Sequence, residues 1–215
     1  MESPAKDKSK KSSYYYDTSD LVIIALFASL GGVFSTFIGY LANLVRYTVG
    51  IPKIGQIFAG LHILWFVLVF LLTNRKVGSV VLCGIIKGFI ELFSASHLGI
   101  LVLYISTGEA IVFEVIFFSF FALIKSKRLL HLEIAVAAGF AAVSNIILQL
   151  NTFLGSALSF ELFLLIIALC FISGVGFGGY LGQMLFHLFQ QSHLLDWRDK
   201  IKEPADSYSK RGSSE

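Results

Sequence analysis

The chain has 215 residues, of which 56% are hydrophobic and only 14% are charged, and its formal net charge is +3. Its mean hydropathy is +0.78, and a soluble chain of this length could not bury so much apolar surface. The composition therefore excludes a soluble domain and indicates an integral membrane protein. Cys83 and Cys170 both fall in apolar runs, so we expect buried, inert thiols rather than a disulfide or a metal site.

A helix needs about 20 predominantly apolar residues to cross a bilayer, and six stretches of the sequence approach or exceed this length. None of them alternates polar and apolar residues as the strands of a membrane barrel do. We predict an all-α integral membrane protein with one membrane domain over residues 20–190, between polar tails over 1–19 and 191–215. The six transmembrane helices are expected, in chain order, over residues 20–45, 57–74, 77–95, 108–125, 131–153 and 160–188.

Positive charges predict the orientation, since Lys and Arg collect in cytoplasmic connections. Basic residues follow the second, fourth and last predicted spans, whereas the connections over 95–107 and 154–159 hold none. Arg46 and Lys53, in the first connection on the opposite side, are exceptions. We therefore predict that the N- and C-termini are both cytoplasmic.

Polar side chains stand inside the predicted spans, where an ionised group costs about 2.5–3.5 kcal/mol. The stretch "IIKGFIELFS" in the third span places Lys87 and Glu91 four residues apart, on one helix face. On the predicted topology, the other candidate binding residues share the outer half of the bundle with Glu91: His62, Trp65, Glu109, Glu114, Asn145, Gln149 and Asn151. Polar groups confined to one half of the membrane favour a binding pocket open to the outside over a channel or a proton relay.

Structural interpretations of the same residues stay open at this point. Lys87 and Glu91 would equally form an internal ion pair, and Glu109 would suit the N-terminus of a helix, where the helix dipole favours an acid. Trp65 would serve as an anchor at the membrane interface as well as a platform for a ligand ring. On the binding hypothesis, Glu91 lines the pocket and Lys87 holds or offsets its charge.

Small residues recur at four-residue spacing in the first and last spans, as Ala28 and Gly32 and as Gly174, Gly178 and Gly182. Such faces let helix backbones approach each other closely. They indicate either packing of the first span against the sixth within this chain or a docking surface for another membrane protein.

Several motifs of enzymes and motors are missing from the sequence. It contains no G-x-x-x-x-G-K-[ST] phosphate loop, no H-E-x-x-H zinc helix and no G-x-S-x-G nucleophile elbow, and its histidines and cysteines show no metal-ligand spacing. We therefore predict no enzymatic activity, no cofactor and no ATP hydrolysis by this chain. A pocket without a motor points to a substrate-capturing subunit of a larger machine.

Three segments carry a resemblance to a known family: "GLHILWF" in the second span, "KVGSVVLCGIIKGFIELFSASHLG" in the third and "GEAIVFEVIFF" in the fourth. The chain resembles the substrate-binding (S) components of energy-coupling factor (ECF) vitamin transporters, and within them the YkoE type, linked to thiamine or its hydroxymethylpyrimidine precursor. Gly78 and Glu91 match the glycine and the glutamate of the third span, and Glu114 matches the acid of the fourth. Trp65 matches the tryptophan of the second span, while Glu109 replaces a glutamine.

Departures from the family pattern are also present. The proline before Gly78 is absent, the family's A-x-x-x-A docking pattern is Ala28-x-x-x-Gly32 here, and Lys87 has no counterpart. The resemblance implies six helices, capture on the outer face of the plasma membrane, and docking through the first, second and sixth helices. The implied partners are a membrane scaffold subunit and cytosolic ATPase subunits, and no nucleic acid.

The chemistry of thiamine suits these residues, because its thiazolium ring is cationic and its aminopyrimidine donates hydrogen bonds. Carboxylates supply charge and acceptors, Trp65 supplies an aromatic face, and the amides of the fifth span read a pyrimidine edge. Other functions stay open: a stand-alone small-solute or cation transporter or channel, an S component for another vitamin or a small cation, and a membrane-embedded enzyme or assembly factor.

Overall fold

The computed structural model describes residues 16–50, 54–94, 99–124, 129–152 and 159–192, and all regular secondary structure within them is helical. The elements in chain order are α1 (Thr18–Val49), η1 (Ile54–Phe58), α2 (Ala59–Leu72), α3 (Ser79–Phe93), α4 (Leu101–Ile124), α5 (Leu130–Thr152), α6 (Phe160–Ser173), η2 (Gly174–Leu181) and α7 (Gly182–Gln191). The 3₁₀ helix η1 runs directly into α2, and the π-helical segment η2 joins α6 and α7 into one long helix. The predicted polar tails lie mostly outside the described residues.

Within the described residues, five helical segments are long and apolar enough to cross a membrane: Thr18–Val49, Ile54–Leu72, Leu101–Phe120, Leu130–Gln149 and Phe160–Gln191. They confirm an all-helical protein with several membrane-spanning helices. The fourth predicted span begins earlier than expected, at Leu101 rather than at residue 108, because the apolar stretch "LVLYIS" continues the helix instead of forming a connection.

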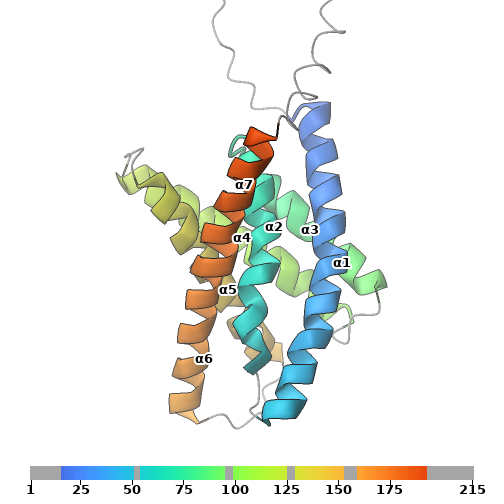
Figure 1. Ribbon diagram of the computed structural model, residues 1–215, viewed down its shortest axis with the longest axis vertical. Coiled ribbons are helices and arrows are strands. Elements are labelled where there is room, and N and C mark those ends of the chain that lie inside the picture. Colours follow the sequence, from blue (N-terminus) through green and yellow to red (C-terminus); the bar gives the residue numbers. More distant parts are fainter. Residues whose placement is uncertain (1–15, 51–53, 95–98, 125–128, 153–158, 193–215) are drawn as a thin grey trace, which may run out of the picture.

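The third predicted span, over 77–95, folds as α3, which has 15 residues. At about 1.5 Å per residue it is roughly 22 Å long, shorter than the ~30 Å hydrocarbon core of a bilayer. Figure 1 shows α3 ending about midway along the length of α1. The predicted count of six complete spans therefore stays a prediction, with α3 as the segment in question.

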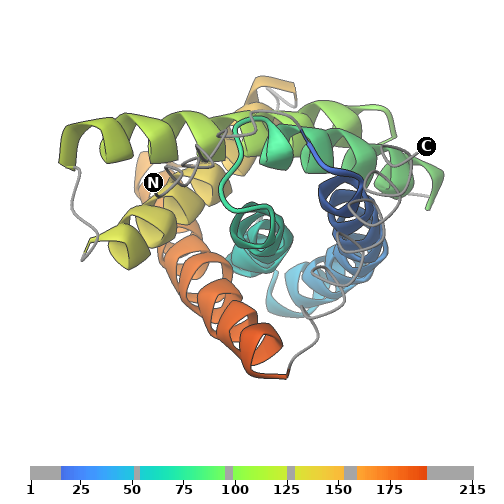
Figure 2. The same ribbon diagram turned by 90° about the horizontal axis from the view of Figure 1, so that it is seen from above.

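The helices fall into two groups by direction. Seen from above, α1 and α2 appear nearly end-on and the α6–α7 helix is tilted, whereas α3 and α4 run lengthwise along one edge of the view (Figure 2). The start of α1 and the end of α7 lie at the same end of the molecule (Figure 1). This arrangement fits a placement of both termini on one side of the membrane, and the cytoplasmic assignment of that side stays a prediction.

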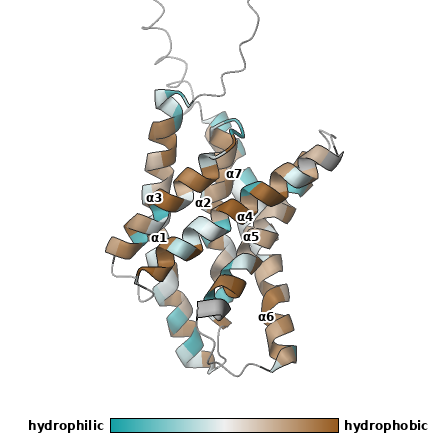
Figure 3. Cartoon of the chain, turned by 180° about the vertical axis from the view of Figure 1, so that it is seen from behind, coloured by the Kyte–Doolittle hydropathy of each residue, from teal (hydrophilic) through white to brown (hydrophobic). Residues whose placement is uncertain are grey.

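Apolar side chains cover the lengths of the helices, and hydrophilic residues gather at helix ends and at a few interior positions (Figure 3). Large apolar side chains are exposed along α1 and α6, such as Phe37 and Leu165. Exposure of this kind is expected where helices meet lipid instead of water.

The helix α2 forms the centre of the bundle, and its residues from Phe66 to Phe70 are all buried. Phe70 lies at the middle of an aromatic group, with T-shaped contacts to Phe113 at 5.4 Å and Phe117 at 4.5 Å between ring centroids. Such edge-to-face pairs add about 0.5–1.5 kcal/mol beyond the burial of their surface. These contacts fix α4 against α2.

The small residues singled out in the sequence are all buried inside this chain: Ala28, Gly32, Gly174, Gly178 and Gly182. A Cβ atom at Gly32 would lie 2.7 Å from Ile90 of α3, and one at Gly178 would lie 3.2 Å from the carbonyl oxygen of Gly60 in α2. These residues therefore let helices of the same chain pack closely against one another. The expected partner helices were wrong, however, because the packing joins α1 to α3, and η2 to α2 and α5, rather than the first span to the sixth.

A docking surface built from these five residues is not available, since each already packs inside the bundle of the same chain. Gly176, on the opposite side of η2, is exposed and has no other side chain near it.

The closest approach of two helices occurs between α2 and the end of α6. A Cβ atom at Gly60 would overlap the carbonyl oxygen of Ser173, and the backbone N–H of Gly60 donates to the Ser173 hydroxyl at 3.1 Å. We expect Gly60→Ala to lower stability by about 1–3 kcal/mol, because the two backbones must move apart. Thermal unfolding in detergent measures the change.

Gly176→Ala is the matched control, since a methyl group there meets open space. It is expected to leave the unfolding temperature unchanged or to raise it, because Ala favours a helix over Gly. Equal effects of the two substitutions would show that the α2–α6 contact is not as close as described.

Candidate functional site

A buried ion pair lies at the end of α3. Lys87 Nζ donates to Glu91 Oε1 at 2.5 Å and to Ser106 Oγ of α4 at 3.4 Å. The two charged residues are only 1% and 4% exposed. The ammonium group also lies 5.4 Å from the centre of the Phe66 ring of α2, in the geometry of a cation–π contact. The predicted i, i+4 pair therefore forms, and it faces the interior of the bundle.

Two glycines of α3 bring α4 close to this pair. A Cβ atom at Gly84 would lie 2.5 Å from Ala110 Cβ, and one at Gly88 would lie 3.0 Å from the backbone of Leu103. Larger residues at these positions would push the helices apart and separate Lys87 from Ser106. The sequence carries this signal as Gly84-x-x-x-Gly88, the same small-residue spacing as in the first and last spans, but it was not among the predicted sets.

A chain of hydrogen bonds continues from α4 to α5 and on to η1. Glu109 Oε1 accepts from Asn145 Nδ2, Gln149 Nε2 donates to Asn145 Oδ1 at 2.6 Å, and Gln56 Nε2 donates to Gln149 Oε1 at 3.1 Å. Asn145 and Gln149 lie one turn apart on α5, so both amides face the same side. Glu109 is 1% exposed. It belongs to this series of hydrogen bonds and also interacts electrostatically with Lys87 of the ion pair.

We call these side chains the polar cluster: Gln56, Lys87, Glu91, Ser106, Glu109, Asn145 and Gln149. They come from η1, α3, α4 and α5 and lie among apolar helices. Lys87 is near enough to both Glu91 and Glu109 for its charge to act on each carboxylate. The arrangement offers charge, hydrogen-bond acceptors and amide donors at one place in a bundle that is otherwise apolar.

The short helix η1, which holds Gln56, is itself fixed to α6. Cys170 Sγ donates to the carbonyl oxygen of Gln56 at 3.3 Å, and the Ser173 hydroxyl donates to the carbonyl oxygen of Ile57. Gln56 is therefore held over the amides of α5. It was not among the predicted site residues, because it stands in a connection where polar residues are common.

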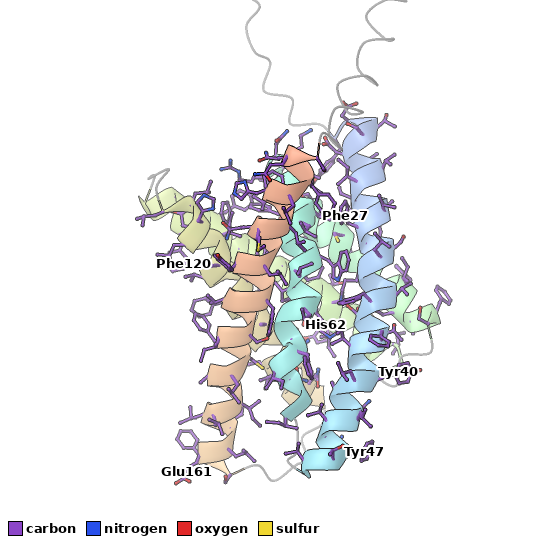
Figure 4. The ribbon with its side chains drawn as sticks, viewed as in Figure 1. Phe27, Tyr40, Tyr47, His62, Phe120 and Glu161 are labelled. Atoms are coloured by element: carbon purple, nitrogen blue, oxygen red, sulfur yellow. The ribbon has the colours of Figure 1, made fainter. Side chains whose placement is uncertain are left out.

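Among the described residues, the two predicted residues of α2, His62 and Trp65, form no hydrogen bond with the polar cluster. His62 lies at mid-height of the bundle (Figure 4), close enough to Lys87 to be affected by its charge. Trp65 packs against two rings of α1, Phe27 at 6.3 Å and Phe34 at 5.6 Å between centroids. Its indole nitrogen is buried without a hydrogen-bond partner in the described part of the chain.

Glu114 does not lie with the other carboxylates. Its side chain accepts hydrogen bonds from the backbone N–H groups of Gly78 and Val80, both at 2.8 Å, and of Val81 at 3.4 Å. It therefore caps the N-terminus of α3, where backbone N–H groups have no partner within the helix. The expectation that Glu114 shares the outer half with Glu91 and Glu109 is wrong, because α4 runs obliquely and carries Glu114 toward the start of α3.

Side chains around this cap bind the start of α1 to the α2–α3 turn. Lys76 Nζ pairs with Asp20 Oδ2 at 2.5 Å, and the Tyr16 hydroxyl donates to the carbonyl oxygen of Val77 at 2.5 Å. Burial, together with the carboxylates of Glu114 and Asp20, raises the pKa of the Tyr16 phenol. A phenol that stays protonated keeps its hydrogen bond to the turn at neutral pH.

The depth of the polar cluster differs from the predicted one. Tyr47 and Glu161 mark the end of the molecule opposite to the start of α1, and His62 lies well above them (Figure 4). Because α3 ends about midway along the length of α1 (Figure 1), the level of its last turn, which contains Glu91, is deeper than predicted. Asn151 falls in the last turn of α5, and its side chain is outside the described residues.

Among the described residues, no group of three or more His, Cys, Asp or Glu side chains is placed to hold a metal ion. Cys83 and Cys170 are both buried free thiols, as predicted from their apolar surroundings.

Comparison with known proteins agrees with this helical architecture. Residues 19–144, more than half of the chain, match the protein family described as "ABC-type cobalt transport system, permease component". A structure described as "Crystal structure of an S-component of ECF transporter" superposes with a TM-score of 0.74 and 18% sequence identity, over 92% of this chain and 98% of that one. No curated protein matches the sequence. At this identity, the structural likeness shows a shared fold.

The cap at Glu114 is expected to stabilise the fold. Glu114→Gln removes the negative charge that accepts three backbone N–H groups, and we expect a loss of about 1–3 kcal/mol, since hydrogen bonds to charged groups are the stronger ones. Thermal unfolding in detergent reports this loss.

Glu161→Gln is the control, because Glu161 is an exposed acid in the first turn of α6. Its removal is expected to change stability by no more than about 0.5 kcal/mol. A Glu114→Gln variant as stable as the control would refute the capping role.

Proposed function

Since this chain belongs to the family of ABC-type cobalt transport permease components, it is a multi-pass protein of the plasma membrane, and we propose that it is the substrate-binding (S) subunit of an ECF-type importer. The fold shared with an S component over nearly the whole of both chains supports this assignment. So does the absence of a phosphate loop from the sequence, because a subunit that binds substrate leaves ATP hydrolysis to its partners.

The polar cluster is the observation that carries the proposal. Burying charged and amide groups in an apolar bundle is costly, and such groups in membrane helices usually mark a substrate or ion path. Here the carboxylates of Glu91 and Glu109 and the amides of Asn145 and Gln149 converge from three helices. Such a set of acceptors and donors suits a small organic solute with polar ring edges.

Within that class we propose thiamine or its hydroxymethylpyrimidine precursor as the ligand, as in the YkoE type. The aminopyrimidine edge would exchange hydrogen bonds with the amides of α5, and a carboxylate of the polar cluster would face the cationic part of thiamine. Trp65 would respond through α2 instead of stacking on the ligand, because its ring already contacts Phe27 and Phe34.

We further propose that both termini are cytoplasmic and that the solute enters from the opposite side. The partners would be a membrane scaffold subunit and cytosolic ATPases. They would meet exposed sides of the helices, since the small residues of α1 and η2 are used for packing within the chain.

Direct binding to the purified chain tests the assignment. The sequence holds two tryptophans, Trp65 and Trp197, so a Trp197→Phe variant restricts the fluorescence signal to α2. Thiamine, hydroxymethylpyrimidine, unrelated vitamins and cobalt ion are titrated in detergent, with calorimetry as a second readout. Saturable binding of a thiamine-related ligand supports the proposal. Binding of another vitamin or of cobalt alone would replace the ligand, and solute flux in liposomes without partners would replace the S-subunit role.

The amide of Asn145 is expected to be important for affinity. Asn145→Leu removes the donor to Glu109 and the acceptor for Gln149, and we expect affinity for the ligand to fall by about tenfold or more. Isothermal titration of the purified variant measures this change.

Ser144→Ala is the control for that substitution, because the Ser144 hydroxyl donates only within its own helix, to the carbonyl oxygen of Ala141 at 2.7 Å. Its affinity is expected to stay within about twofold of the unmodified chain. If both variants bind alike, the amides of α5 are not part of the binding site.

A further inference from the structure

The charges of the polar cluster do not balance. It contains one ammonium group, that of Lys87, and two carboxylates, those of Glu91 and Glu109. Lys87 Nζ is paired with Glu91 at 2.5 Å, and this is the cluster's one ion pair among the described residues. When ionised, the cluster therefore holds one negative charge in excess.

The excess charge lies on Glu109. Within the part of the chain that the structure describes, its carboxylate forms no ion pair, and its hydrogen bond comes from the neutral amide of Asn145. Lys87 acts on Glu109 through its charge, but its Nζ donates to Glu91 and Ser106 instead. Glu109 is thus a buried acid that has no cation in direct contact among the described residues.

A buried carboxylate without a cation is unstable in surroundings of low dielectric constant, so it takes up either a proton or a cation. A ligand with one positive charge would make the cluster neutral. A neutral ligand would leave the excess charge in place, and a ligand with two positive charges would exceed it.

We propose that Glu109 is the counter-ion of a ligand with a single positive charge, and that Lys87 determines this specificity by neutralising Glu91. The inference rests on the proposed S-subunit function and narrows its ligand to an organic monocation. Between the two candidates above, it selects thiamine, whose thiazolium ring carries a permanent charge, over neutral hydroxymethylpyrimidine.

Two variants separate this assignment from one in which Glu91 meets the ligand. Glu109→Gln keeps the Lys87–Glu91 pair and removes the excess charge. The double variant Lys87→Met with Glu91→Gln removes the pair and keeps Glu109. Replacing both members of a buried pair avoids leaving one charge alone, which is the change that destabilises most.

Dissociation constants are measured for thiamine and for its neutral thiophene isostere, in which carbon replaces the charged ring nitrogen. The unmodified chain is expected to prefer thiamine. Glu109→Gln is expected to lose about tenfold to a hundredfold of that preference, since it loses a charge-assisted contact. The double variant is expected to keep the preference within about threefold, with thermal unfolding as a check on the fold of each variant.

A second measurement uses the unmodified chain and does not depend on the folding of any variant. Hydrophobic carbodiimides modify buried carboxyl groups, and mass spectrometry of the peptide with Glu109 gives the rate. Thiamine is expected to slow this modification at least about tenfold, and the neutral isostere is expected to leave it unchanged. Equal protection by both ligands, or by neither, would overturn the assignment of Glu109.

The remaining outcomes are distinguishable. If Glu109→Gln keeps the preference and the double variant loses it, Glu91 is the counter-ion and the inference is wrong. If the unmodified chain binds hydroxymethylpyrimidine but not thiamine, or binds thiamine and its isostere equally, the inference fails while the S-subunit role stands. If cobalt alone binds, the inference fails while the S-subunit role stands. If neither cobalt nor any organic solute of the panel binds, the proposed function itself fails, and the inference fails with it.

Discussion

The cost of burying charge among apolar helices is the constraint on which this structure depends. Lys87 and Glu91 are both almost fully buried, and they are stable there because each neutralises the other across 2.5 Å. The surrounding helices are placed so that the remaining polar atoms find partners. Gly84 and Gly88 let α4 approach with Ser106 and Glu109, and α5 supplies amides to Glu109.

The short helix α3 follows from the same constraint. It ends about midway along the length of α1 (Figure 1), and its second half holds the buried residues Lys87 and Glu91. Its first turn has backbone N–H groups without partners within the helix. Glu114 satisfies three of them from α4, and the Lys76–Asp20 pair closes the same end against α1. One end of α3 is thus fixed by this cap and ion pair, while the other half carries the buried Lys87–Glu91 pair of the proposed binding site.

Acids that look alike in the sequence therefore occupy different structural positions. Glu91 and Glu109 stand in the polar cluster, Glu114 holds a helix end, and exposed Glu161 begins α6. The proposed binding role would use both kinds of acid, because a site inside a membrane depends on the helices that hold its side chains in place. The tight packing of η2 against α2 and α5 serves that purpose, and it leaves partner proteins to meet the outward faces of the helices.

The sequence by itself determined the class of fold, the helices and the Lys87–Glu91 pair, because apolar length and i, i+4 spacing are local properties. It also singled out Glu109, Asn145 and Gln149, since polar residues in apolar runs are conspicuous. Only the tertiary structure decided that Glu114 caps α3, that Gln56 joins the amides of α5, and that the glycines of η2 face α2 and α5. These facts depend on the tilt of α4 and on which helices become neighbours, and hydropathy along one chain carries no information about either.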